Sequence, residues 1–147
     1  MSLNFIDGDL STVFSNRKLE RLEYLNLSMN GLDGEIPDDL YSSINLTDLN
    51  LSHNMELTGN LSSSVSDLTK LRVLDLRNCS LTSSIPSSIT KLANLTQLFM
   101  GFNRELTGTL PSDIGNMLSL EIFKLWTANI QGSVNNLYAH NFVWSWI

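Results

Sequence analysis

Leucines recur along this chain at a fixed spacing, with polar residues between them. The string Leu-x-x-Leu-x-Leu-x-x-Asn, with a few substitutions, begins at Leu22, Leu46, Leu71, Leu95 and Leu120, so successive copies start 24, 25, 24 and 25 residues apart. Within each copy, Leu-x-Leu has the two-residue apolar period of a strand that is buried on one face. Each copy therefore predicts one short strand whose leucines point inward and whose x residues point outward.

The Asn that ends each string is expected to join neighbouring copies. The chain turns there, and a buried Asn side chain, which both donates and accepts, satisfies backbone groups that water cannot reach. Cys79 takes this position in the third copy and Ala128 in the fifth, whereas the second and fourth copies carry one extra residue directly after the Asn. The predicted ladder consists of Asn4, Asn30, Asn54, Cys79 and Asn103.

The second half of each copy also aligns. One position holds Gly34, Gly59, Gly108 and Gly132, with Ser83 in the third copy, and all three prolines of the chain follow three residues later, at Pro37, Pro86 and Pro111. Glycine suits a turn with an unusual backbone angle, and proline suits an extended return segment that makes no backbone pairing. We therefore expect short turns, rather than long helices, on the side opposite the strands.

These motifs resemble the plant-type leucine-rich repeat, whose later half reads Leu-x-Gly-x-Ile-Pro-x-x-Leu. Leu32-x-Gly34-x-Ile36-Pro37-x-x-Leu40 matches it in full, and the resemblance extends over about residues 1–137. It implies an α/β-type, right-handed solenoid. A parallel β-sheet would form the concave face, and short turns and 3-10 segments would form the convex face.

We predict a single leucine-rich-repeat domain over residues 1–147. Both ends fall within repeat units, which favours a chain taken from a longer array, although the apolar C-terminal tail would alternatively cap the last unit. The predicted divisions are a partial unit 1–21, full units 22–45, 46–70, 71–94, 95–119 and 120–143, and a further partial unit or tail 144–147.

The outward positions of the predicted strands form the concave face, the usual binding surface of a solenoid. They are small and polar in the N-terminal half, whereas aromatic and basic residues gather in the C-terminal half. Exposed aromatics beside Arg are typical of binding hot spots. The alternative is that the rings merely cover the end weakened by Ala128 or face a missing unit. The candidate ligand-binding residues are Arg77, Phe99, Phe102, Lys124 and Trp126.

Composition narrows the function further. The 147 residues are 42% hydrophobic and only 16% charged, and the net charge of -6 argues against nucleic-acid binding, which needs a basic surface. No stretch approaches the roughly 20 apolar residues of a membrane span, and the first residues lack the pattern of a signal peptide. A single cysteine excludes an internal disulfide.

No catalytic, metal-binding or cofactor-binding motif is present. Cys79 falls on an inward position, which predicts a buried structural thiol rather than a nucleophile. His53 and His140 are isolated from other metal-ligand residues. The sequence therefore predicts a protein that is not an enzyme and binds neither a metal nor a cofactor.

Asn-x-Ser/Thr sequons suggest a glycosylated protein of the secretory pathway. Serine and threonine are so frequent that roughly three such sequons would arise without selection. Two of the six lie on the predicted binding face, where a glycan would obstruct a partner. The candidate glycosylation sites are Asn26, Asn45, Asn50, Asn60, Asn78 and Asn94.

The resemblance implies part of the extracellular region of a plant receptor-like kinase or receptor-like protein. Such a module binds a protein or peptide ligand, or a co-receptor, at the cell surface, and it signals through a membrane segment and sometimes a kinase elsewhere in the parent protein. One alternative is a secreted inhibitor of a cell-wall-degrading enzyme, which predicts inhibition of a pectin hydrolase. Another is a truncated repeat fragment without activity, which predicts a broad melting transition.

Overall fold

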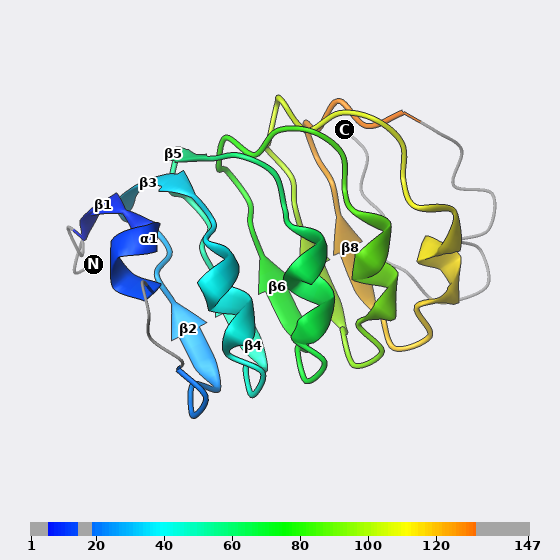
Figure 1. Cartoon of the computed structure of the whole chain (residues 1–147). Coiled ribbons are helices and arrows are strands. Elements are labelled where there is room, and N and C mark those ends of the chain that lie inside the picture. The colour runs from blue at the N-terminus through cyan, green and yellow to red at the C-terminus, as the bar shows by residue number, and fades with distance from the viewer. Residues whose placement is uncertain (1–5, 15–18, 132–147) are drawn as a thin grey trace.

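The computed structural model describes residues 6–14 and 19–131, which wind into successive coils (Figure 1). Each coil contributes one short strand to a parallel sheet in which neighbours in sequence are neighbours in space. This order is the one expected of a solenoid, because each repeat contacts only its neighbours. The strands are β2 (Tyr24–Asn26), β4 (Asp48–Asn50), β6 (Val73–Asp75), β7 (Gln97–Phe99) and β8 (Ile122–Lys124).

The register of this sheet places one apolar residue of each coil in a single inward row. Leu25 pairs with Leu49, Leu74 follows, and the row continues through Leu98 to Phe123. The last four side chains are at most 1% exposed, whereas Leu25 in the first strand is half-buried. The leucine spacing therefore fixes the register, since a slip by one residue would turn every apolar side chain outward.

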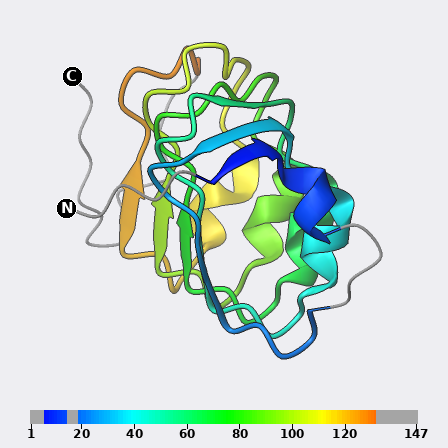
Figure 2. The same ribbon diagram turned by 90° about the vertical axis from the view of Figure 1, so that its left-hand side faces the viewer.

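Short 3-10 helices form the opposite layer, as Figure 2 shows from the N-terminal end. Each follows an extended residue, and in three of the four coils this residue is a proline of the repeat, because the fixed proline φ suits the start of a helical turn. The helices are η1 (Asp38–Ser42), η2 (Ser63–Asp67), η3 (Ser87–Lys91) and η4 (Ser112–Asn116), and a short α1 (Leu10–Phe14) precedes them. The predicted solenoid with a short-turn convex layer is confirmed.

A second parallel sheet, which is not among the predicted elements, joins the coils along another edge. It consists of β1 (Asp7–Asp9), β3 (Gly31–Glu35) and β5 (Glu56–Thr58). Its register is offset, so that Gly34 of one coil lies opposite Leu57 of the next. Isolated bridges carry the same pairing toward the C-terminus. The return segment before each proline is thus part of the backbone pairing between coils.

The repeated glycine position has a left-handed backbone throughout. Gly34, Gly59 and Gly108 have φ of 73°, 79° and 86°, and Ser83 adopts 64° where the third coil lacks the glycine. A Cβ atom at Gly59 would lie 2.7 Å from Cγ of Glu35 in the preceding coil. Both the backbone angle and the close approach of adjacent coils therefore favour glycine there.

Asn side chains join the coils at the turn after each strand. Asn54 donates from Nδ2 to the carbonyls of Leu51 and, in the preceding coil, Leu27, at 2.8 and 3.0 Å. Its Oδ1 accepts the N–H of Leu32, also in the preceding coil, at 3.2 Å. Asn103 makes the equivalent three bonds, and Asn30 accepts the N–H of Ile6. Asn4 of the predicted ladder lies outside the described residues.

The extra residue in two of the coils compensates for the positions where the ladder lacks Asn. Cys79 donates from Sγ to the carbonyl of Leu51 at 3.4 Å, but it offers no amide oxygen to the coil before it. The N–H of Leu57 in that coil instead closes a four-residue β-turn onto the carbonyl of Asn54, at 3.1 Å. Before Ala128, Leu106 closes the same turn onto Asn103, also at 3.1 Å. Among the described residues, these turns occur only in the coils with the inserted residue.

Within the described residues, no helix is long and apolar enough to cross a membrane.

Candidate functional site

The outward side chains of β2, β4, β6, β7 and β8, together with the residues that follow each strand, form the surface that we call the concave face. Its N-terminal half exposes Tyr24 and Met29, at 67% and 55%, and is otherwise largely polar and internally hydrogen-bonded. Oδ1 of Asn26 accepts both the N–H and the hydroxyl of Ser28, at 3.0 and 2.7 Å, and Asn50 does the same for Ser52. These Asx turns occupy the amide oxygens at the strand ends, so they are not available to a partner.

The third strand ends on a buried acid. Asp75 takes the outward position between Leu74 and Leu76, yet it is only 4% exposed because the Arg77 side chain covers it. The carboxylate accepts Nε and Nη2 of Arg77 at 2.9 and 2.6 Å, and it also accepts the Arg77 backbone N–H at 3.1 Å. The hydrogen bonding of the Arg77 side chain to the Asp75 carboxylate raises the pKa of Arg77 above its ordinary value. Arg77 is therefore a cation whose charge is already balanced within the protein.

The five candidate ligand-binding residues form one continuous series of contacts. The guanidinium carbon of Arg77 lies 4.9 Å from the centroid of the Phe99 ring, and Nζ of Lys124 lies 5.8 Å from the same centroid. Nζ also lies 4.9 Å from the Trp126 ring, which meets Phe102 edge to face at 6.2 Å. Cations and aromatic rings thus alternate from Arg77 to Trp126, and Phe102 adds a further ring. We call the whole series the cation–aromatic patch.

The patch is neither fully buried nor fully solvated. Phe99, Lys124 and Trp126 are half-buried, and Phe102 is 45% exposed. The rings therefore keep accessible surface that a partner could cover. If Phe99 and Trp126 were both buried in the fold, no such surface would remain. Nε1 of Trp126 is itself buried and has no hydrogen-bond partner among the described residues. Whether these residues bind a ligand stays a proposal.

Glycine at position 101 allows this packing. Gly101 lies between Arg77 and Trp126 in the row of outward residues that follows the strands, and a Cβ atom there would lie 2.9 Å from both N and O of the Trp126 backbone. Phe102 then adopts a left-handed φ of 61°, as the equivalent residue does in every other described coil. The outward row thus lacks a side chain at Gly101, directly beside Trp126.

Cys79 and His53 do not form a reactive pair. The thiol is 5% exposed, and its burial raises the pKa of Cys79 to about 11, so it stays protonated at neutral pH. Nδ1 of the exposed His53 lies 3.0 Å from Nδ2 of Asn78 rather than beside a nucleophile. His140 lies outside the described residues.

The predicted glycosylation positions differ in how far their amides are already used. Asn45 and Asn94 donate from Nδ2 to carbonyls of the preceding coil, whereas Asn26, Asn50 and Asn78 bond to side chains on the concave face. Asn60 is exposed and lines a hollow beside Gly34 and Pro37. Asn60 and Asn94 are both exposed and lie away from the concave face, but the amide of Asn94 already donates to the carbonyl of Thr69.

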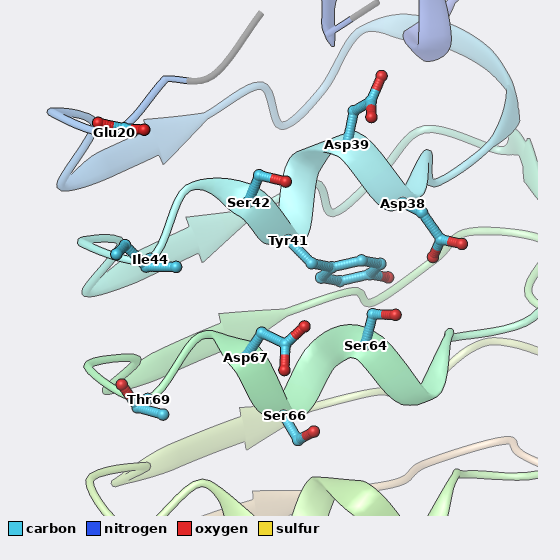
Figure 3. A pocket seen from close by; sticks show the side chains of 10 residues that line it. All are labelled: Glu20, Asp38, Asp39, Tyr41, Ser42, Ile44, Ser64, Ser66, Asp67 and Thr69. Atoms are coloured by element: carbon cyan, nitrogen blue, oxygen red, sulfur yellow. The ribbon is translucent and has the colours of Figure 1, made fainter. Parts of the chain in front are cut away.

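The convex side carries a separate hollow of about 750 Å³ between η1 and η2 (Figure 3). Four of its side chains are carboxylates, the rest are neutral, and Tyr41 forms its buried floor. No group of three His, Cys, Asp or Glu side chains able to hold a metal occurs in the described part of the chain. The lining residues are Glu20, Asp38, Asp39, Tyr41, Ser42, Ile44, Ser64, Ser66, Asp67 and Thr69.

Comparison with known proteins agrees with this architecture. Residues 1–139 match the family model described as a leucine-rich repeat region. A search of curated proteins gave no match.

Several solved structures are similar over nearly the whole chain. One is the ectodomain of the plant membrane receptor kinase GASSHO1/SCHENGEN3 from Arabidopsis thaliana in complex with CASPARIAN STRIP INTEGRITY FACTOR 2, with 28% identity, a TM-score of 0.84, and coverage of 96% of this chain and 17% of that chain. Another is the Arabidopsis receptor kinase HAESA in complex with the peptide hormone IDA and the co-receptor SERK1, with 26% identity, a TM-score of 0.83, and coverage of 99% and 25%. A TDR receptor shares 30% identity, with a TM-score of 0.80 and coverage of 97% and 25%. The chain thus spans a quarter or less of these receptor chains.

Proposed function

Because the chain belongs to the leucine-rich repeat family, we propose that it is a non-catalytic recognition module that binds a protein or peptide on its concave face. The observation that carries the proposal is the cation–aromatic patch. Exposed aromatic rings packed against cationic side chains bind partners well, because they bury a large area at a small cost in side-chain entropy.

The location of binding follows from the contrast between the two halves of the concave face. In the N-terminal half, the strand-end amide oxygens of Asn26 and Asn50 are bonded within their own coils, and Tyr24 is the exposed ring. In the C-terminal half, the rings of Phe99, Phe102 and Trp126 keep accessible surface. A ligand therefore gains more by covering the C-terminal half.

The similar structures support a receptor setting for this module. Two of them are receptor kinases solved in complexes, one of which includes a peptide hormone and a co-receptor. We propose, on that likeness, that this chain forms part of a plant receptor ectodomain at the cell surface, that its parent protein is associated with the membrane and signals, and that it is glycosylated. A co-receptor is then a second possible partner.

A peptide library displayed on phage tests the concave-face proposal. The purified protein should select clones whose binding falls at least tenfold on Trp126→Ala or Arg77→Ala substitution. Leu118→Ala and Arg104→Ala are matched controls, because both residues are exposed and lie outside the patch, and they should leave binding unchanged. Equal binding of the same clones by all four variants would contradict the proposal.

A further inference from the structure

Lys124 carries a charge that the protein does not balance. Its ammonium lies between the Phe99 and Trp126 rings and forms no ion pair with any residue that the structure describes. Arg77, at the other end of the same series, is held by two oxygens of Asp75. Of the two cations in the patch, Lys124 is therefore the one available to an anionic partner.

A second donor without an acceptor lies beside this ammonium. Nε1 of Trp126 is buried and unpaired within the described part of the chain, and the ring that carries it has its centroid 4.9 Å from Nζ of Lys124. Buried donors are nearly always hydrogen-bonded in native proteins, so an unpaired one calls for an explanation. Nε1 is closed to solvent, so the Lys124 ammonium, on a half-buried side chain, is the donor that a ligand oxygen can reach.

We infer that the peptide bound on the concave face places a side-chain carboxylate, from Asp or Glu, against Lys124 and the Trp126 indole. This inference rests on the proposed function and specifies the chemistry of its ligand. A carboxylate accepts charge-assisted hydrogen bonds from the ammonium, which already packs against the Trp126 ring. The chain's net charge of -6 disfavours a polyanion such as a nucleic acid, and a single unbalanced cation suits a single acid.

Rings on both sides of the ammonium favour a carboxylate within the peptide over one at its end. Phe99 lies on one side of Lys124 and Trp126 on the other, and Phe102 extends the ring surface beyond Trp126. An internal Asp or Glu has a neighbour in each direction that can pack on these rings. The inferred ligand is therefore a peptide in which an acidic residue is flanked by apolar or aromatic residues.

Synthetic peptides test this chemistry directly. A clone selected on the protein is made with its acidic residue, with the Gln or Asn isostere, and with an amidated C-terminus, and each affinity is measured by titration calorimetry. The isostere should bind the wild-type protein about 10 to 100 times more weakly, because hydrogen bonds to a charged group are lost. Amidation should leave the affinity unchanged, and added salt should weaken only the acidic peptide.

Variants of Lys124 assign the effect to the patch. Lys124→Met should bind the acid and its isostere equally, whereas Lys124→Arg should keep the preference for the acid. Lys91→Met on η3 is the matched control and should behave as the wild type does. Circular dichroism of each variant establishes that it is folded.

Three results would overturn the inference: equal affinity for acid and isostere in the wild type, an acid preference that survives Lys124→Met, or a loss of affinity on amidation alone. Selected peptides that bind the patch but ignore the acid would leave the proposed function standing. The absence of any peptide that binds through the patch would remove the proposed function as well.

Discussion

Substituting Asn103 by Ala tests how the coils are held together. Asn103 is fully buried, and its amide bonds three backbone groups at once. Nδ2 donates to the carbonyls of Met100 and Leu76, each at 2.8 Å, and Oδ1 accepts the N–H of Leu81 at 3.1 Å. Two of these groups belong to the preceding coil, so the substitution removes bonds both within and between coils.

The magnitude follows from what is left unpaired. Leu76, Leu81 and Met100 are themselves fully buried, so water does not replace the lost partners. Leaving a buried backbone group unsatisfied costs about 1–3 kcal/mol, and the three groups relax in part, so Asn103→Ala should destabilise the fold by about 3–5 kcal/mol. Ala128→Asn should add less than about 1 kcal/mol, because the N–H of Leu106 already bonds to the carbonyl of Asn103.

Urea unfolding followed by circular dichroism measures both changes, and amide hydrogen exchange locates them. The N–H of Leu81 should exchange faster in Asn103→Ala, whereas that of Leu106 should respond less, because its acceptor is a backbone carbonyl. Asn116→Ala, an exposed Asn at the end of η4, controls for the change of residue type. A loss below about 1 kcal/mol, or unchanged exchange at Leu81, would refute the ladder as a source of stability.

Three further predictions concern single positions. Ser83→Gly should stabilise the protein by about 0.5–1 kcal/mol in urea unfolding, because glycine removes the strain of a left-handed φ of 64° but has more entropy to lose. Gly59→Ala should lower the thermal midpoint, because its Cβ would press on Glu35 at a φ of 79°; an unchanged midpoint would contradict the close approach of the coils. Burial raises the pKa of Cys79 to about 11. The contribution of the protonated thiol to the free energy of unfolding should therefore be complete below about pH 9 and be lost as the pH rises toward 11. In pH-dependent unfolding, Cys79→Ala should remove that loss below pH 10, where Tyr41, whose pKa burial also raises, does not yet contribute.

The sequence predicts the concave sheet because its signal is local and repeated. Leucine at every second position fixes which face of each strand is buried, and a constant coil length fixes the register, as the pairing of Leu49 with Leu74 illustrates. The start of the 3-10 layer follows the prolines for the same reason, since Pro37 and Pro86 precede η1 and η3 directly.

The second sheet could not be predicted in this way, because its strands are paired through backbone groups and no side-chain pattern marks them. β3 contains two glycines, and its register opposite β5 is offset from the repeat by two residues, so no apolar period marks it. The sequence pattern also does not show that a four-residue β-turn replaces the hydrogen bond to an Asn side chain. The inserted residue after Asn54 is visible in the sequence, but only coordinates show that it lets Leu57 bond within its own coil.

The placement of the patch residues on one face was predictable, but their electrostatics were not. The outward positions of β7 and β8 identify Phe99 and Lys124 from the two-residue period alone. The period also assigns Asp75 to an outward position, but it does not show that Arg77 folds over this carboxylate and buries it. Which of two cations is balanced depends on side-chain reach, which a repeat alignment does not contain.

The backbone of the concave face is set by the fold, which leaves its chemistry to the side chains. The residue before the Asn position has a φ between 53° and 61° in all five coils, although its identity differs in each: Met29, His53, Asn78, Phe102 and Thr127. Such strain commonly marks a functional site, but here it recurs at every turn and so reflects the geometry of the coil. What distinguishes one coil from another is therefore whether its outward polar groups are already paired. By that criterion Lys124, which forms no ion pair with any described residue, is the position at which partner recognition should be tested first.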